Sequence, residues 1–177
     1  MNLQRYLITD RTLCGGLSGL FKLLNARMAS GVEYIQIREK DLSARELFEF
    51  TRALVGARGQ RRTKILVNTR ADIAAAAGAD GVHLPASAAR LSMPGLLIGR
   101  SCHTLREIRN ANADYVTFSP VFASPGKGDP VGLDQLREAS QLGLPVFALG
   151  GITWENAGEC MNAGATGVAG IRLFLDR

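Results

Sequence analysis

The chain repeats one short unit, in which a small residue and a glycine precede a brief apolar run. Copies with glycine begin at Ser30, Ala77 and Ala163, and a copy without glycine begins at Asn112. Glycine directly after a helix-like segment is a C-cap signal, because it adopts a positive φ without strain. A short apolar run behind such a cap is typical of a buried parallel strand. The repeat therefore predicts strands that alternate with helices.

Four further apolar runs lie between these copies, at residues 6–9, 64–67, 97–99 and 146–149. Together with the repeated units they give eight strands. A capping box, Ser43-Ala44-Arg45-Glu46, predicts that one of the intervening helices begins at Ser43. Eight strand–helix units in one short chain predict a single (β/α)8 barrel domain over residues 1–177. An open doubly wound sheet is the alternative, but the first strand–helix turn lacks G-x-G-x-x-G.

The sequence ends shortly after the eighth predicted strand, at Leu175-Asp176-Arg177. The final helix of the barrel is therefore expected to be missing or vestigial. An uncovered flank of a barrel has to be buried, and a subunit interface is one way to bury it. We expect a homo-oligomer on this ground.

Composition excludes several other classes of partner. The net charge is +5, but the densest basic run, residues 58–64, is interrupted by polar residues and fits a solvated connection. Aromatic residues make up only 6%, so no nucleic-acid platform is expected. No apolar run reaches the roughly 18 residues of a membrane span. The three cysteines share no metal spacing and favour a reducing cytoplasm.

Glycines stand at the ends of the seventh and eighth strands, where a barrel gathers its active site. Gly150 and Gly151 follow the seventh strand, and Gly170 ends the eighth. Exposed backbone N–H groups that converge there predict a phosphate site. The alternative is that these glycines only make turns.

Three cations predict a second anion pocket. Lys127 stands between Gly126 and Gly128 in a loop rich in Ser, Pro and Gly, and a lysine in such a loop can close over an anion. Arg38 and Lys40 alternate with Glu39, so both are expected to point the same way from an extended segment. The alternative is a structural charge network with Glu39, Asp41 or Asp10.

The two histidines differ in their surroundings. His83 lies inside an apolar strand and is expected to be a structural or pocket-wall residue. His103 follows Ser101 and Cys102 at a helix start, where it is a candidate general acid or base, with capping as the alternative. No carboxylate stands at ligand spacing from either histidine, so a zinc site is not expected.

Motifs at the strand ends resemble the thiamine phosphate synthase/TenI superfamily over nearly the whole chain, in order. They are Ile8-Thr9-Asp10-Arg11, Gln36-Ile37-Arg38-Glu39-Lys40-Asp41, Val67-Asn68-Thr69-Arg70, Ala79-Asp80-Gly81-Val82-His83-Leu84, Gly99-Arg100-Ser101-Cys102-His103-Thr104, Ser119-Pro120-Val121-Phe122 and Ala148-Leu149-Gly150-Gly151-Ile152-Thr153. The resemblance implies a (β/α)8 barrel and a small phosphorylated heterocycle as ligand. In the synthase reaction, a pyrimidine methyl pyrophosphate loses pyrophosphate and the thiazole nitrogen traps the cation.

The resemblance also implies roles for individual residues. Arg38, Lys40 and Asn68 would hold pyrophosphate, with Ser124 and Lys127 from the loop after the sixth strand. The thiazole phosphate would lie on Gly150 and Gly151, near Gly170 and Ile171. Ser101, in the motif of the fifth strand, would contact the substrate.

Three positions depart from the pattern of the family. Synthases hold Mg²⁺ with aspartates at the positions of Thr69 and Ala88, so no cofactor is expected unless the chain is a synthase. The Leu84-Pro85 and Gly99-Arg100-Ser101 spellings resemble the TenI branch, some members of which are thiazole tautomerases, but Pro120 replaces the tautomerase histidine.

The first hypothesis is therefore a metal-independent TenI-like protein that binds a thiazole phosphate. In it, His103 is the remaining acid–base candidate and Lys127 is the second catalytic candidate. The alternatives are a thiamine phosphate synthase and a non-catalytic phosphate-ligand binder or regulator.

Overall fold

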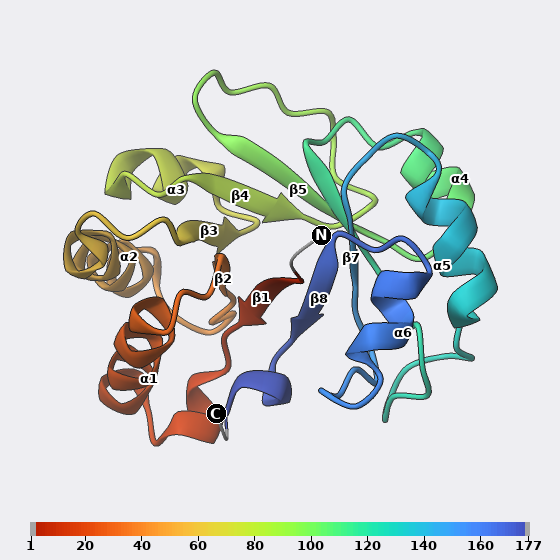
Figure 1. The fold of residues 1–177 in the computed structure, drawn as a ribbon. Helices are drawn as coiled ribbons and strands as arrows, with labels where there is room; N and C mark the ends of the chain where they lie inside the picture. Colours follow the sequence, from red (N-terminus) through yellow and green to blue (C-terminus); the bar gives the residue numbers. More distant parts are fainter. Residues whose placement is uncertain (1–2, 176–177) are drawn as a thin grey trace.

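The computed structural model describes residues 3–175, and within them eight parallel strands close into a barrel (Figure 1). Each strand pairs with the next along the chain, and β8 pairs with β1, with Gln4 opposite Gly167 and Leu7 opposite Gly170. The predicted (β/α)8 barrel is thereby confirmed. The strands are β1 (Gln4–Ile8), β2 (Tyr34–Ile37), β3 (Lys64–Asn68), β4 (Gly81–Leu84), β5 (Leu97–Cys102), β6 (Tyr115–Phe118), β7 (Val146–Ala148) and β8 (Gly167–Gly170).

The helices surround the barrel, with α1, α2 and α3 on one side and α4, α5 and α6 on the other (Figure 1). Two short 3-10 helices, η1 after β1 and η2 after β8, complete the described part of the chain. The bounds are α1 (Leu17–Ala29), α2 (Ala44–Arg58), α3 (Ala71–Ala77), α4 (Leu105–Arg109), α5 (Gly132–Ser140), α6 (Ala157–Asn162), η1 (Arg11–Cys14) and η2 (Arg172–Phe174).

The capping box at the start of α2 forms as the sequence predicts. The Glu46 backbone N–H donates to Ser43 Oγ, and the Ser43 backbone N–H donates to Glu46 Oε2 at 2.9 Å. These bonds satisfy donors that a helix start leaves unpaired. Leu47, Phe50 and Leu54 are buried along one stripe of the same helix, which fixes α2 against the barrel.

An irregular segment, residues 85–96, joins β4 to β5 where the repeat would place a helix. Arg100 is 5% exposed, and its guanidinium donates to the carbonyls of Ala88 and Ala89, both at 2.7 Å. Backbone carbonyls of this segment are thus paired by a side chain from β5 instead of by helical hydrogen bonds. The arginine therefore positions this segment.

Aromatic side chains fill the interior of the barrel. Tyr6, Tyr34, Tyr115 and Phe147 pack on one another with ring centroids 5.1 to 5.9 Å apart. Such tilted and edge-on contacts are favourable for aromatic pairs. The barrel centre is therefore a packed core and not a channel.

The flank of the barrel beside β8 is covered by η2, a short 3-10 helix in agreement with the expected vestigial last helix. Phe174 is 2% exposed and packs edge-on against Trp154 at 5.6 Å, and Arg27 Nε donates to the Phe174 carbonyl at 2.8 Å. Leu13 is the one exposed large hydrophobic side chain in residues 3–175, at 42%. Asp176 and Arg177 lie outside the described residues.

Because η2 covers this flank, an uncovered flank no longer supports the expectation of a homo-oligomer. The homo-oligomer stays a prediction. A separate result concerns membranes: none of the described helices has both the length and the hydrophobicity to cross one.

Candidate functional site

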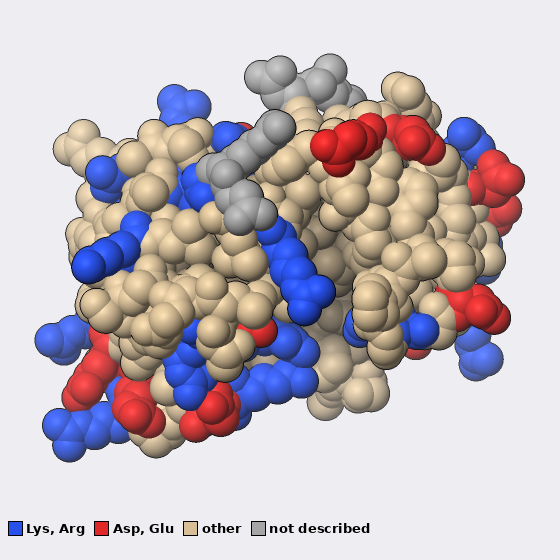
Figure 2. All heavy atoms as spheres, turned by 90° about the horizontal axis from the view of Figure 1, so that it is seen from below, with Lys and Arg blue, Asp and Glu red and all other residues tan. Residues whose placement is uncertain are grey.

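A cavity of about 560 Å³ opens at the carboxyl ends of the strands. All the expected site residues except Lys40 line it, namely Arg38, Asn68, Ser101, His103, Ser124, Lys127, Gly150, Gly151, Gly170 and Ile171. Figure 2 shows the molecule from below the view of Figure 1, from the side on which β1 and β8 end. Lys and Arg side chains border a hollow near the middle of that face. The barrel thus gathers in one place residues that are far apart in the sequence.

Lys40 does not join Arg38 in the cavity lining. Its side chain is exposed, and the chain begins a turn at Lys40, so the extended alternation that starts at Arg38 ends before it reaches this residue. The expectation that both cations point the same way requires extended backbone through Lys40. The structure corrects that expectation.

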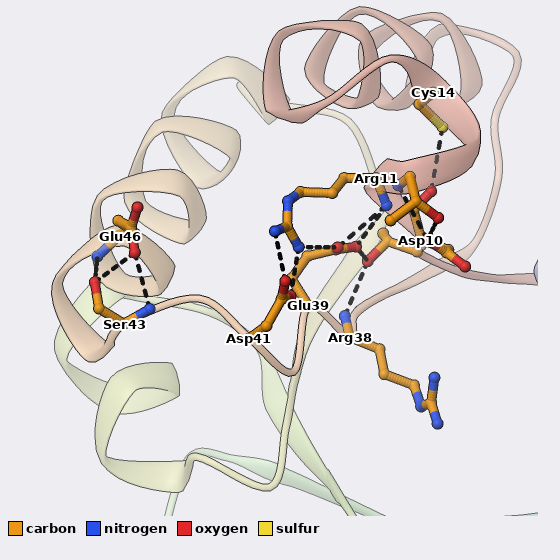
Figure 3. Close-up of polar contacts among 10 residues, drawn as sticks. Asp10, Arg11, Cys14, Arg38, Glu39, Asp41, Ser43 and Glu46 are labelled. Atoms are coloured by element: carbon orange, nitrogen blue, oxygen red, sulfur yellow. Dashed lines mark hydrogen bonds and ion pairs between the residues drawn. The ribbon is translucent and has the colours of Figure 1, made fainter.

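Arg11, and not Arg38 or Lys40, makes the charge network beside β2 (Figure 3). Its guanidinium contacts Glu39 Oε2 at 3.3 Å and both carboxylate oxygens of Asp41, at 2.5 and 2.7 Å. This pairing lowers the pKa of Asp41 to about 2. Because Arg11 occupies both carboxylates, they are not available to Arg38.

The same network fixes the backbone of Arg38. Thr9 Oγ1 donates to the buried Glu39 carboxylate at 2.5 Å and accepts from the Arg38 backbone N–H at 2.9 Å. Figure 3 shows the Arg38 side chain turned away from this network, and it lines the cavity. Within residues 3–175 the Arg38 guanidinium makes no hydrogen bond or ion pair. A held backbone with an unpaired cation suits an anionic ligand.

A buried polar network forms the floor of the cavity. Tyr6 Oη donates to Gln36 Oε1 at 3.0 Å, and Gln36 Nε2 donates to Asn68 Oδ1 at 2.9 Å. His83 is joined to the same group through Tyr6 and Tyr115, each at 3.2 Å from Nδ1. Buried polar groups that are satisfied in this way rigidify their surroundings.

His83 also connects this network to Ser101. Its Nε2 lies 3.0 Å from Ser101 Oγ, so both ring nitrogens are used. Burial lowers the pKa of His83 to about 3, and the positive charge of Arg38 acts in the same direction. His83 is therefore neutral at physiological pH and positions Ser101, in agreement with the expected pocket-wall role.

His103 lines the cavity next to the loop that follows β6. Its Nδ1 lies 2.8 Å from the carbonyl oxygen of Ser119, and because a carbonyl only accepts, Nδ1 carries the proton. The Nε2 atom has no partner in the described chain and is the ring nitrogen left for a ligand.

Gly150 and Gly151 are required by packing as well as by backbone conformation. They adopt φ values of 91° and 66°, and a Cβ atom at Gly151 would lie 2.5 Å from the Ala123 carbonyl oxygen. The next helix, α6, begins only at Ala157, so its N-terminus is not part of this glycine turn. A larger residue at Gly151 would therefore disturb the loop after β6 as well as any bound ligand.

Free backbone N–H donors lie in this turn, at Gly151 and the following residue, Ile152. In the part of the chain from residue 3 to residue 175, no group accepts a hydrogen bond from the N–H of Gly151 or Ile152. Both residues line the cavity. Unpaired N–H groups that face one space are the donors a phosphate needs.

The residues at the two positions where the resemblance places metal-binding aspartates do not fit Mg²⁺. Thr69 and Ala88 offer no carboxylate, and residues 3–175 contain no cluster of three or more His, Cys, Asp or Glu side chains that could hold a metal ion. Mg²⁺ prefers carboxylate and other hard oxygen ligands. Thr69 also adopts φ = 60°, a left-handed conformation that β-branched residues rarely adopt, and Thr69 Oγ1 donates to the Asn68 carbonyl at 2.8 Å.

Among the polar and charged residues of the lining, five were not predicted as parts of the site: Asp10, Gln36, Thr117, Ser119 and Arg172. Gln36 and Thr117 could have been found from strand alternation, because they lie two positions along their strands from residues that face the barrel interior. Thr117 Oγ1 is buried and has no hydrogen-bond partner. Arg172 directly follows Gly170 and Ile171, but no motif marked it.

The sequence matches the family model described as thiamine monophosphate synthase over residues 5–174. A putative thiamine-phosphate synthase of Geobacter sulfurreducens is 47% identical, and the alignment covers 96% of this chain and 85% of that protein. A thiamine-phosphate synthase of Azorhizobium caulinodans is 36% identical, with 95% and 85% covered. These names favour the synthase alternative over the TenI-like one and give no support to a tautomerase.

A solved structure agrees with the sequence comparisons. The thiamine phosphate pyrophosphorylase of Pyrococcus furiosus superposes with a TM-score of 0.84 at 31% identity, over 96% of this chain and 85% of that one. The similarity extends over almost the whole barrel, including the strand ends that line the cavity.

Proposed function

Because the chain belongs to the thiamine monophosphate synthase family, we propose that it joins a pyrimidine methyl pyrophosphate to a thiazole phosphate in the cavity. One observation carries the proposal: a single cavity of about 560 Å³ combines two kinds of anion-binding group. Free N–H groups lie at Gly151 and Ile152, and the unpaired cations of Arg38 and Lys127 line the same space. A reaction between two phosphorylated substrates needs both to be held around one space.

The proposed reaction breaks one bond and forms one. The bond between the methylene carbon of the pyrimidine and its pyrophosphate oxygen breaks, and both electrons leave with pyrophosphate. The thiazole nitrogen then donates its lone pair to the methylene carbon. Negative charge grows on the leaving oxygen, so cations fixed beside it lower the barrier.

We assign that stabilisation to Arg38 and Lys127, with Asn68 as a neutral hydrogen-bond partner. Lys127 is exposed in a loop whose turn is closed by a hydrogen bond from its backbone N–H to the Ser124 carbonyl, at 3.1 Å. The thiazole phosphate is assigned to the backbone at Gly150, Gly151, Gly170 and Ile171. Lys40 receives no role, because it lies outside the lining.

His103 and Ser101 are assigned to the orientation of the heterocycles. His103 Nε2 has no partner in the described chain, and Ser101 is held by neutral His83 at 3.0 Å. The bond-forming step transfers no proton, so neither residue has to act as an acid or base in it.

The second candidate is a phosphate-ligand binder without turnover. It is favoured by Thr69 and Ala88, because the resemblance places metal-binding carboxylates of synthases at these positions, and neither residue is one. This candidate shares the binding assignments above and differs only in the chemical step.

The test is direct product formation. The purified protein is incubated with both substrates, with and without Mg²⁺, and thiamine phosphate is measured by chromatography. The expected result is formation of thiamine phosphate that falls at least 10-fold in Lys127→Gln, while Lys22→Gln, an exposed lysine outside the cavity, leaves the rate unchanged. Thiazole phosphate binding without any product would contradict the first candidate and support the second.

A further inference from the structure

The ligand assigned to this cavity is strongly anionic, and the described residues of its lining include only one carboxylate that could recruit a metal ion. Thr69 and Ala88 stand at the two metal positions. Among the described residues, Asp10 is the only acidic side chain in the lining, and its Oδ1 accepts from the backbone N–H and the hydroxyl of Thr12, at 3.0 and 2.6 Å. Glu39 is engaged with Thr9 and Arg11.

Cations in the same lining are unengaged. Arg38, Lys127 and Arg172 all line the cavity, and none makes an ion pair or a side-chain hydrogen bond within residues 3–175. They come from three places in the fold: the end of β2, the loop after β6 and the junction of β8 with η2. Arg11, from η1 after β1, is by contrast held by two carboxylates, Glu39 and Asp41 (Figure 3).

The charges in the lining therefore do not balance. Three cations face one carboxylate, so the lining carries an excess of two positive charges (3 − 1 = 2). Guanidinium and ammonium groups recognise phosphate oxygens directly, and they do so most strongly where they have no competing partner.

We propose that Arg38, Lys127 and Arg172 neutralise a bound diphosphate directly, so that this cavity binds it without a divalent metal ion. Arg172 is the new member of the site. It directly follows Gly170 and Ile171 in the chain, and its side chain lines the same cavity as Arg38 and Lys127. The ligand's chemical class rests on the proposed function, whereas the charge balance rests on the described residues alone.

The first measurement uses inorganic pyrophosphate as the probe, titrated calorimetrically into the protein in EDTA and in excess Mg²⁺. The expected result is saturable binding in EDTA that Mg²⁺ does not strengthen. Binding that appears only with Mg²⁺, or that Mg²⁺ strengthens 10-fold or more, would overturn the proposal. Absence of binding under both conditions would overturn it too.

The second measurement compares two variants with the same loss of charge. Arg172→Gln is expected to weaken pyrophosphate binding in EDTA about 10-fold or more, since one charge-assisted hydrogen bond is lost. Arg62→Gln removes an exposed arginine outside the cavity, and it is expected to change binding less than twofold. Equal weakening of pyrophosphate binding in both variants would show only a general effect of net charge and would contradict a specific role for Arg172.

A third variant protects the test against misfolding. Arg172→Lys keeps the charge, and it is expected to bind pyrophosphate more tightly than Arg172→Gln while both melt at the wild-type temperature. Equal affinity of the two variants would contradict a charge-based role.

The two proposals can fail separately. Metal-free pyrophosphate binding without formation of thiamine phosphate would refute the proposed function and leave this inference standing. Formation of thiamine phosphate together with strictly Mg²⁺-dependent pyrophosphate binding would support the proposed function and refute this inference.

Discussion

His83 makes the stability of the fold depend on pH. Its pKa is about 3 in the folded protein and ordinarily about 6.5, so below pH 6.5 the unfolded chain takes up a proton that the folded chain does not. Stability from this group is complete above pH 6.5 and is lost as the pH falls toward 3. The free energy of unfolding is expected to drop by about 2 kcal/mol between pH 7 and pH 5.

Urea unfolding of wild type and His83→Gln at both pH values checks this expectation. The variant should lose the extra drop between pH 7 and pH 5, whereas His103→Gln, at the exposed histidine, should keep it. Asp41 and Asp72, with pKa values of about 2, affect stability only near and below pH 4 and stay outside this window. An unchanged pH dependence in His83→Gln would contradict the assignment.

Thr117, in the cavity lining, carries a hydroxyl group whose effect on stability can be tested by substitution. Its hydroxyl is buried without a partner, and an unsatisfied buried hydroxyl costs roughly 1–3 kcal/mol. Thr117→Val is therefore expected to raise the free energy of unfolding by about 1 kcal/mol in the unliganded protein. The matched control, Thr63→Val, loses a buried bond to the Val32 carbonyl at 2.7 Å and should lower it. Destabilisation by both variants would show that the Thr117 hydroxyl has a partner.

The sequence could predict which strand-end residues would come together, because a parallel barrel brings the carboxyl ends of all its strands to one face. Lys40 could not be placed, since the sequence does not show that the extended chain turns there. Arg172 was missed because an arginine after a strand carries no pattern of its own; only its place in the cavity lining distinguishes it. Whether Arg38 is free depended on which cation pairs with Glu39 and Asp41. Arg38 and Lys40 stand in the same motif as these carboxylates, but the cation that pairs with them, Arg11, comes from the motif after β1.

At the scale of elements, strands were predicted better than helices. Short apolar runs identified all eight strands, three of them with a preceding glycine, because buried parallel strands are short and continuously apolar. The capping box located the start of α2 for a local chemical reason. The segment between β4 and β5 lacks apolar periodicity and contains Pro85 and Pro94, and the structure replaces the helix there with an irregular segment held by Arg100.

Arg100 is expected to control that segment. Arg100→Met keeps most of the apolar stem but leaves the carbonyls of Ala88 and Ala89 without their donors. The free energy of unfolding should fall by about 2–3 kcal/mol, since hydrogen bonds from a charged group are lost. Amide hydrogen exchange should accelerate over residues 85–96.

Arg90→Met provides the control for this prediction. Arg90 is exposed in the same segment, so its loss should change neither stability nor exchange. Unchanged exchange over residues 85–96 in Arg100→Met would show that the segment is held by other contacts, such as the packing of Leu91 and Leu96 on Val82, Leu84 and Ile98.

At the scale of the whole molecule, the flank of the barrel beside β8 is covered by a short piece of chain, η2. The sequence predicted the vestigial last element, but it could not show that η2 would fold back and bury Phe174. That outcome depends on a long-range contact: Arg27, in α1, donates to the carbonyls of Phe174 and Leu175 at 2.8 and 3.3 Å. Such pairings across 147 residues leave no local signal.

Phe174→Ala tests whether this residue seals the flank. The side chain is 2% exposed and belongs to the same core cluster as Leu20, Leu24 and Ile35, so its truncation is expected to cost about 3–5 kcal/mol. Urea unfolding measures the loss, and Leu13→Ala, at an exposed apolar residue, should change stability by less than about 1 kcal/mol. If the flank is instead buried against a second copy of the chain, the melting temperature of the wild type will rise with protein concentration. If Phe174 alone covers the flank, the melting temperature of the wild type will not depend on protein concentration. Light scattering will then detect self-association only in Phe174→Ala.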